Sequence, residues 1–247
     1  MKQKILLFDI ETTPNVGYTW GKYEQDVIKF KEEGHIMCFA YKWLGGKTQF
    51  ISEYDFSKNG EYEVTKKLHE LFNEADTVVA HNGDSFDIKM ANRAFIKHSL
   101  PPTKPFISID TKKIAKNKFR FNSNKLDDLG EYLGLGRKVD TGGFDLWLGC
   151  MARDKKSLKL MRKYNIQDVD LLEKVYLKLR GWDNHRHMNE LSPYKHICPI
   201  CGSDKVQSRG VELSGGMIHR RFQCQECGKW SRGNSLGRAI PKEYILK

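Results

Sequence analysis

The sequence predicts an α/β domain, in which a mixed sheet is flanked by helices, followed by a small module that contains cysteines. Apolar runs of strand length alternate with helical patterns over about the first 180 residues, an order typical of a sheet covered by helices. Four of the six cysteines form two closely spaced pairs near the C-terminus. A chain of 247 residues is long enough for one sizeable core and such an appendage.

The first predicted elements are three strands. Residues 5–11, ILLFDIE, join four apolar residues directly to two acidic ones. Residues 35–46 and 47–54 have strand patterns that meet at a Gly-Gly pair, which predicts a hairpin.

The following elements alternate between helix and strand. Helical spacing of apolar residues predicts four helices, and short apolar runs predict two more strands. The predicted helices cover residues 63–75, 85–98, 124–136 and 155–180, and the predicted strands cover residues 77–82 and 105–110. This order favours a mixed sheet with helical cover.

Two acidic residues end the first strand. Asp9 and Glu11 are two residues apart, so their side chains point to the same face of that strand. Neighbouring carboxylates repel one another and burial raises that cost, whereas a divalent cation between them removes both penalties. Oxygen ligands of this kind suit Mg²⁺ or Mn²⁺. We therefore predict a metal site at the end of the first strand.

Asp87 is a third candidate ligand. It lies in the first turn of a predicted helix, where a carboxylate also suits the helix dipole. Asp84 competes for the same role. We favour Asp87, because Phe86 can anchor it whereas Asp84 resembles a turn residue.

The longest predicted helix contains a fourth acidic candidate. Tyr164 and Asp168 are four residues apart and share one helix face, which is otherwise apolar. An acid on a face directed to the core is costly unless it has a partner. Asp168 is therefore a candidate metal ligand. Tyr164 is either a residue that orients a water molecule or an ordinary core residue.

Three ordered motifs now resemble a known family. They are Asp9-Ile-Glu11, Asn82-x-x-x-Phe86-Asp87 and Tyr164-x-x-x-Asp168. Together they resemble the tyrosine subclass of the DEDD (DnaQ-like) exonuclease superfamily, most closely the 3′→5′ proofreading domain of family B DNA polymerases. Standalone phage exonucleases are similar too, which is compatible with a phage-encoded protein. The resemblance implies a ribonuclease H-like fold, and the chain is too short to hold a polymerase as well.

The resemblance also implies a mechanism and a ligand set. Two Mg²⁺ or Mn²⁺ ions per active site would support phosphodiester hydrolysis that releases nucleoside 5′-monophosphates from single-stranded 3′ ends of DNA. The implied metal ligands are Asp9, Glu11, Asp87 and Asp168, and Tyr164 would position the attacking water. Asn82 and Phe86 would contact the substrate, although a turn-forming asparagine and core packing explain these two residues as well.

The cysteine module predicts a second metal site. Two C-x-x-C pairs are separated by 22 residues, and each pair is followed by glycine. Four thiolates satisfy tetrahedral zinc with no open position, so one structural Zn²⁺ is expected. The candidate ligands are Cys198, Cys201, Cys224 and Cys227. The module resembles a zinc ribbon of transcription factors and transposases.

We expect an exonuclease domain over residues 1–183, a linker over 184–196 and a zinc ribbon over 197–247. The formal net charge of +11 points to nucleic acid as partner, and the polymerase-like motifs favour DNA over RNA. The ribbon would grip nucleic acid or dock on a replication or recombination protein. No run approaches the roughly 18 apolar residues of a membrane span. Without a secretory signal, a cytoplasmic, intracellular location and no membrane partner are expected.

Two alternatives to a DNA exonuclease remain at this point. The same carboxylate chemistry would serve a 3′→5′ exoribonuclease. The zinc ribbon would also suit a non-catalytic adaptor that binds nucleic acid. Retention of all four acids and the tyrosine argues against the adaptor.

Overall fold

The computed structural model describes residues 3–23, 26–138, 141–183 and 197–238. The chain divides into two compact units. One unit comprises Lys4–Tyr176, and the other comprises Met1–Gln3 with Leu177–Lys247. The boundary therefore falls within the long helix α6, Lys155–Leu179. The expected linker, 184–196, lies outside the described residues, and the predicted domain limits stay predictions.

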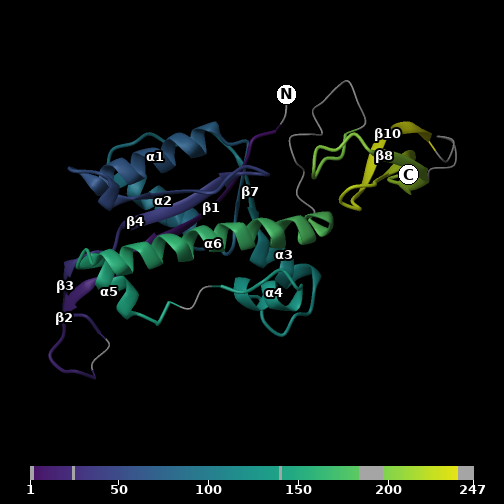
Figure 1. The fold of residues 1–247 in the computed structure, drawn as a ribbon. Helices are drawn as coiled ribbons and strands as arrows, with labels where there is room; N and C mark the ends of the chain where they lie inside the picture. Colours follow the sequence, from purple (N-terminus) through teal and green to yellow (C-terminus); the bar gives the residue numbers. More distant parts are fainter. Residues whose placement is uncertain (1–2, 24–25, 139–140, 184–196, 239–247) are drawn as a thin grey trace. The chain divides into compact units, whose positions relative to one another are not determined.

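A five-stranded sheet forms the centre of the first unit (Figure 1). Its order is β5-β4-β1-β6-β7. β1 and β6 pair in parallel, as do β6 and β7, whereas β4 is antiparallel to both β1 and β5. The mixed sheet predicted from the sequence is confirmed. The strands are β1 (Ile5–Thr12), β4 (Ile36–Trp43), β5 (Gln49–Ser52), β6 (Thr77–Ala80) and β7 (Ile107–Asp110).

Helices cover both faces of this sheet, with α1 and α2 on one side and α6 on the other (Figure 1). All four helices predicted from apolar spacing are present. The helices other than α6 are α1 (Gly60–Glu74), α2 (Asp87–Lys97), α3 (Thr111–Lys118), α4 (Leu126–Tyr132) and α5 (Asp145–Met151), with 3₁₀ turns at Glu53–Asp55 and Arg180–Trp182.

The core has two parts, one on each face of the sheet. On the α1 side, Phe8 of β1 packs edge-on against Phe72 of α1, with ring centroids 5.1 Å apart. On the other side, Met37 and Cys38 of β4 pack with Met161 of α6. Full burial of side chains of this size contributes about 1.5–3 kcal/mol each. The second cluster fixes α6 against β4, the strand that pairs with β1.

Three regular segments were not predicted from the sequence. They are a two-stranded hairpin, β2 (Val16–Tyr18) and β3 (Lys29–Glu32), and the short helices α3 and α5. The hairpin strands are largely exposed, so they have no alternation of buried and exposed residues to detect. The two helices have eight and seven residues, too few for a clear helical period.

The second unit contains an antiparallel sheet of three strands in the order β10-β9-β8. A small buried cluster of Cys198, Ile200 and Cys224 is its described core. The strands are β8 (Val206–Ser214), β9 (Met217–Cys224) and β10 (Trp230–Arg238). Across the described ranges, no helix has the length and apolarity that a membrane crossing requires.

Candidate metal centres

Three of the predicted carboxylates meet at the carboxyl end of β1. Asp9 and Glu11 come from β1, and Asp168 comes from α6. One oxygen from each of the three lies within 4.8 Å of the others. Residues 157 or more positions apart in the sequence thus share a space small enough for one cation. The sheet and α6 create this site because the cluster of Met37, Cys38 and Met161 holds the helix against β4, which pairs with β1.

The fourth predicted carboxylate, Asp87, lies beside Asp9 but outside that group of three. It is the first residue of α2 and is buried. Its Oδ1 accepts a hydrogen bond of 3.1 Å from the backbone N–H of Ile10. The competing acid, Asp84, instead pairs with Lys113 at 2.7 Å and accepts a hydrogen bond from Ser108.

Burial and mutual repulsion perturb the acids. Burial raises the pKa of Asp9 well above its usual value, and the charges of Asp87, Glu11 and Asp168 raise it further. Burial, followed by the charge of Asp168, raises the pKa of Glu11 to about 8. Burial also raises the pKa of Asp87 to about 6. Such a group of acids is favourable only when protons or cations neutralise it.

The donor set fits a divalent metal ion. Oδ1 of Asp168 is buried and has no hydrogen-bond partner among the described residues. An orphaned buried carboxylate oxygen is costly, and coordination by a hard cation would satisfy it. The residues present are therefore compatible with a divalent metal ion.

Lys138 also belongs to the site, although no pattern in the sequence predicted it. Its Nζ donates a hydrogen bond to Oδ2 of Asp168 and lies 3.3 Å from the hydroxyl of Tyr164. The same ammonium lies 5.1 Å from the centroid of the Tyr164 ring. Burial alone would lower the pKa of Lys138, but Asp168 raises it overall, so the lysine stays charged. It joins the tyrosine and the aspartate of the third motif into one cluster.

Two further polar side chains hold the β1 acids. Asn165 is fully buried, and its Nδ2 donates hydrogen bonds of 2.7 Å to Oδ2 and 3.2 Å to the carbonyl oxygen of Asp9. Trp147 of α5 lies near Glu11 and lowers the pKa of that carboxyl, which opposes the effect of burial. Neither residue was predicted, although Asn165 is a polar residue near Asp168 on a helix face that is otherwise apolar.

The two candidate substrate residues lie at the turn from β6 to α2. Asn82 has a φ of 72°, a left-handed conformation that asparagine tolerates. Its Oδ1 accepts a hydrogen bond of 3.2 Å from Nζ of Lys112. Phe86 is 41% exposed at the N-cap of α2, so it is not a core residue. Both residues belong to the turn that leads to Asp87, and this places them next to the carboxylates.

The four predicted zinc ligands also converge. The Sγ atoms of all four cysteines lie within 4.8 Å of one another, with Cys198 and Cys227 3.5 Å apart and Cys201 and Cys224 3.6 Å apart. A tetrahedral site with Zn–S distances of about 2.3 Å requires sulfur atoms about 3.8 Å apart. Gly202 and Gly228 follow the pairs with φ of 71° and 75°, which closes each turn. The cluster fits one tetrahedral metal ion.

Comparisons with known proteins cover the first unit. A family model described as RNase_H superfamily matches residues 6–180. The structure is similar to the family B DNA polymerase from the hyperthermophilic archaeon Pyrobaculum calidifontis, with a TM-score of 0.50 and 15% sequence identity. That match covers 73% of this chain and 26% of the polymerase, so the chain spans about a quarter of the polymerase's length. The likeness is one of fold. No curated protein matches the chain.

Proposed function

Because the chain belongs to the RNase_H superfamily, we propose that it is a metal-dependent 3′→5′ exonuclease acting on single-stranded ends of DNA. Membership indicates a nuclease-type hydrolase that binds nucleic acid and divalent metal. The fold expected from the three motifs, a ribonuclease H-like mixed sheet flanked by helices, is confirmed. We propose the 3′→5′ polarity of hydrolysis, the preference for DNA and the residue roles given below.

The convergence of Asp9, Glu11 and Asp168 is the observation that carries the proposal. Three acids within 4.8 Å of one another, Asp168 buried and the other two half-buried, repel one another, and this repulsion opposes folding. Catalytic sites are where such costs are found, because the acids then hold the metal ions that reaction requires. A non-catalytic adaptor would gain nothing from this arrangement.

Each residue of the cluster has a role in this proposal. Asp9, Glu11 and Asp168 would hold one Mg²⁺ or Mn²⁺ ion on the side of the nucleophile, and Asp9 and Asp87 would hold the other. When bound, the two ions would activate a water and stabilise the attacking and leaving oxygens of the phosphodiester. Asn165 keeps Asp9 in place through the hydrogen bonds described above, and Trp147 favours the charged form of Glu11.

Tyr164 is assigned to water positioning. Burial, followed by the charges of Asp168, Glu11 and Asp9, raises the pKa of its hydroxyl far above the usual value, so the hydroxyl stays protonated. It can therefore orient a water by hydrogen bonding but does not act as a base. Lys138, in contact with both Tyr164 and Asp168, holds a positive charge where a substrate phosphate would approach.

The second unit would bind one structural Zn²⁺ through its four cysteines and contact nucleic acid. Its described strands carry exposed or half-buried basic residues, and the guanidinium of Arg221 lies 5.2 Å from the centroid of the Trp230 ring. Cationic and aromatic side chains together suit a nucleic-acid strand. The ribbon is thus proposed as a second contact with the substrate rather than as a catalytic site.

A hydrolysis assay with end-labelled substrates tests the proposal. Single-stranded DNA and RNA, each labelled at either the 3′ or the 5′ end, are incubated with Mg²⁺ or Mn²⁺. We expect immediate release of labelled mononucleotide from 3′-labelled DNA and a descending ladder from 5′-labelled DNA. Faster release from RNA would show that RNA, and not DNA, is the preferred substrate. Immediate release of mononucleotide from 5′-labelled DNA, with a ladder from 3′-labelled DNA, would show that hydrolysis runs 5′→3′.

A matched pair of variants links that activity to the carboxylates. Glu11→Gln removes one charge from the cluster, whereas Glu70→Gln removes one from an exposed ion pair on α1. We expect Glu11→Gln to reduce the rate by at least about 100-fold and Glu70→Gln to leave it unchanged. Wild-type rates in Glu11→Gln would refute the proposed centre.

A further inference from the structure

We propose that α3 and the loop that follows it bind the single-stranded tail of the substrate as it leads away from the carboxylate centre. This surface, residues 112–125, is called the α3 strip below. The inference rests on the proposed function, because it specifies the substrate of the same site as a strand with an unpaired tail of several nucleotides. Three observations support it: the charge of the strip, its aromatic rings and its attachment to the site.

The strip is strongly cationic. Residues 111–126 contain six Lys and Arg residues and no Asp or Glu. Lys112 and Lys113 contact Asn82 and Asp84, respectively. The other four are exposed, and none forms an ion pair with an acidic residue in the described ranges: Lys116, Lys118, Arg120 and Lys125. Lys116 and Lys118 also suit the C-terminal dipole of α3, but Arg120 and Lys125 lie beyond the helix.

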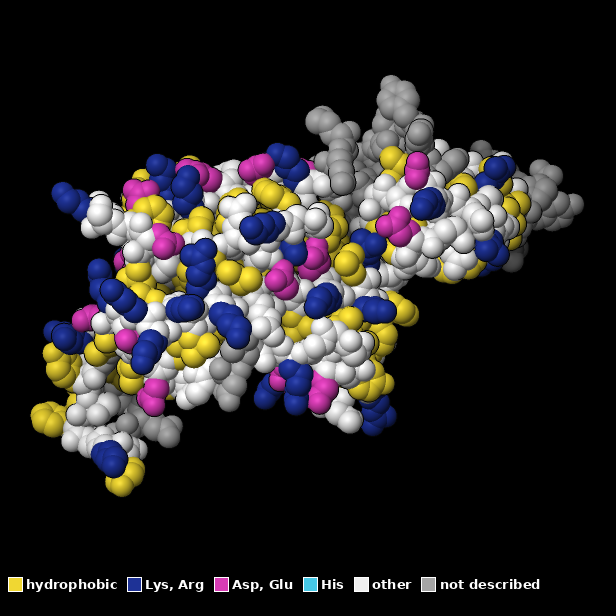
Figure 2. All heavy atoms as spheres, in the orientation of Figure 1, with side chains coloured by type: hydrophobic (Ala, Val, Ile, Leu, Met, Phe, Trp, Pro, Cys, Tyr) yellow, Lys and Arg dark blue, Asp and Glu magenta, His cyan; other side chains and the backbone are white. Residues whose placement is uncertain are grey.

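Charge alone does not single out this strip, because Lys and Arg side chains are spread over the whole visible face (Figure 2). The strip differs by combining cations with rings. Phe119 and Phe121 stack with centroids 5.0 Å apart and an interplanar angle of 26°. Tyr132 of α4 meets Phe121 edge-on at 5.2 Å and is 75% exposed. Phe119 and Phe121 are half-buried, and together with Tyr132 they form a partly exposed platform on which bases stack whatever their identity.

The strip begins and ends at the edge of the sheet where the acids lie. β1, β6 and β7 are parallel, so their carboxyl ends share one edge. Asp110, at the end of β7, caps α3 by accepting hydrogen bonds from the backbone N–H groups of Lys112 and Lys113. At the other end of the strip, Nε2 of His81 lies 2.9 Å from the carbonyl oxygen of Asn124. His81 directly follows β6.

The dimensions of the strip fit a short length of single strand. Eight helical residues extend about 12 Å, a length that a few nucleotides of unpaired strand span. Phosphates would meet the cations, and bases would meet the rings. A paired duplex keeps its bases inside and cannot use the rings, so the geometry points to an unpaired strand.

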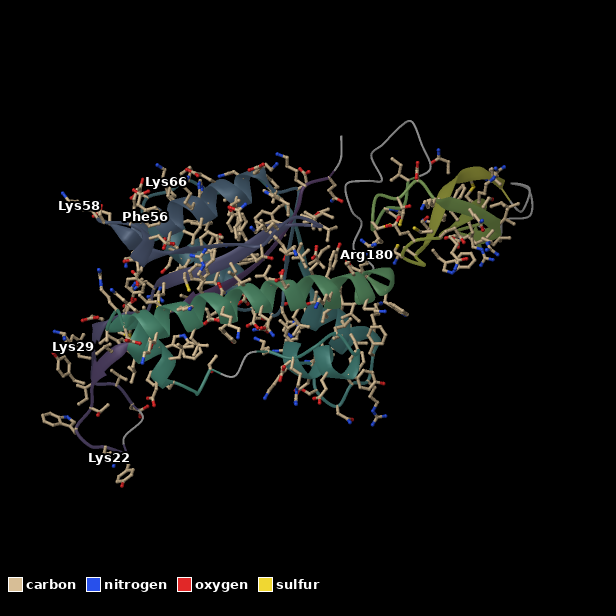
Figure 3. All side chains as sticks on the ribbon, viewed as in Figure 1. Lys22, Lys29, Phe56, Lys58, Lys66 and Arg180 are labelled. Carbon is tan, nitrogen blue, oxygen red and sulfur yellow. The ribbon has the colours of Figure 1, made fainter. Side chains whose placement is uncertain are left out.

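Binding measurements on the full chain test this assignment. A fluorescent single strand of twelve nucleotides is titrated in Ca²⁺ over a range of salt concentrations, and a blunt duplex of equal length is titrated in parallel. The variant Lys118→Gln/Arg120→Gln removes two unpaired cations of the strip. The control Lys58→Gln/Lys66→Gln removes two exposed cations near α1, where Figure 3 places them. Thermal melting verifies that every variant is folded.

We expect the strip variant to bind the single strand about tenfold more weakly than the wild type. The slope of log K against log salt should fall in magnitude by about 1.4, the value for two phosphate contacts. A second variant, Phe121→Ala, should weaken single-strand binding by about tenfold without changing that slope, because stacking does not release counterions. The control should retain both the affinity and the slope.

The rate on a substrate without a tail separates this inference from the proposed function. Hydrolysis of the p-nitrophenyl ester of thymidine 5′-monophosphate should be unaltered in Lys118→Gln/Arg120→Gln. If the wild type hydrolyses no substrate, the proposed exonuclease function is wrong. The binding measurements then still test whether the α3 strip binds single-stranded nucleic acid. The strip assignment is wrong if its variant binds the single strand like the wild type, or if duplex binding falls by the same factor.

Discussion

Nδ2 of Asn165 in α6 lies 2.7 Å from Oδ2 of Asp9 in β1, across 156 positions of sequence. A second hydrogen bond of 3.2 Å reaches the backbone carbonyl of the same aspartate. One buried amide therefore fixes both the side chain and the main chain of the acid that would bridge two metal ions. Tyr164 precedes Asn165 directly, so the turn of helix that presents the tyrosine also positions the strand carboxylate.

Asn165→Ala should impair metal use rather than abolish chemistry. Without its donor, Asp9 can rotate, and loss of such a supporting contact typically costs about 10–100-fold in activity or metal affinity. We expect the Mg²⁺ concentration for half-maximal rate to rise by a factor in that range, with partial recovery at high Mg²⁺. Metal titrations of the hydrolysis rate measure this, with Asn92→Ala as an exposed amide control. An unchanged metal requirement would contradict the role given to Asn165.

Asp9→Asn should stabilise the metal-free protein while eliminating hydrolysis. The acid is half-buried beside three other acids, and its pKa is raised, so its negative charge opposes folding when no cation is present. A neutral amide of the same shape removes that repulsion, and about 1 kcal/mol would raise the Tm by at least about 2 °C. Scanning calorimetry in EDTA measures the change. Addition of Mg²⁺ should then raise the Tm of the wild type but not of the variant, because only the wild type binds it tightly.

His35 should make stability depend on pH. Nε2 of His35 lies 2.9 Å from Oε2 of Glu53, and this hydrogen bond raises the pKa of the histidine despite its partial burial. The folded state therefore keeps the proton at higher pH than the unfolded state does. The stabilisation is complete below about pH 6.5, the unfolded pKa, and is lost as pH rises through the higher folded pKa.

Urea unfolding of the wild type and of Glu53→Gln between about pH 6 and pH 9 measures this contribution. The free energy of unfolding should differ most between the two proteins at the low end of that range and converge at the high end. A difference that stays constant with pH would show that the pair does not titrate on unfolding.

Removal of one cysteine ligand should release zinc and leave the first unit intact. Cys201→Ser replaces one thiolate of the cluster, and a site with three thiolates binds zinc much more weakly. Elemental analysis should find about one zinc per chain in the wild type and in Cys150→Ala, and much less in Cys201→Ser. Hydrolysis of a substrate without a tail should persist in Cys201→Ser. Full retention of zinc would place the ion elsewhere.

Much of the fold follows from the sequence because the buried elements have clear apolar patterns. β1, β4, β6 and α6 were predicted within about three residues, since the strands are continuous apolar runs and the helix has helical spacing. Helix α3 was missed, because only Thr111, Ile114 and Ala115 are buried in a segment rich in lysine. These few buried residues are too few to give the segment a recognisable helical pattern.

The site was predictable only where its residues form local motifs. Asp9 and Glu11 share a strand, and Tyr164 and Asp168 share a helix, so spacing alone placed each pair on one face. Lys138 belongs to no helix or strand and reaches Asp168 through tertiary structure, so no local pattern marks it. The sequence did hold a signal for Asn165, as a second polar residue on the apolar side of α6.

The bond between Asp87 and Ile10 has a practical consequence for anyone who wants an inert form of the protein. β1 pairs with β6 only as far as Leu7, and beyond this point the amide of Ile10 relies on a side chain for its partner. The substitution Asp87→Ala would leave the backbone N–H of Ile10 without a hydrogen-bond partner in the interior, at a cost of about 1–3 kcal/mol. Asp87→Asn keeps an acceptor there. Trapping of an uncleaved complex for crystallography should therefore start from asparagine at this position, since alanine would confuse loss of catalysis with loosening of the sheet.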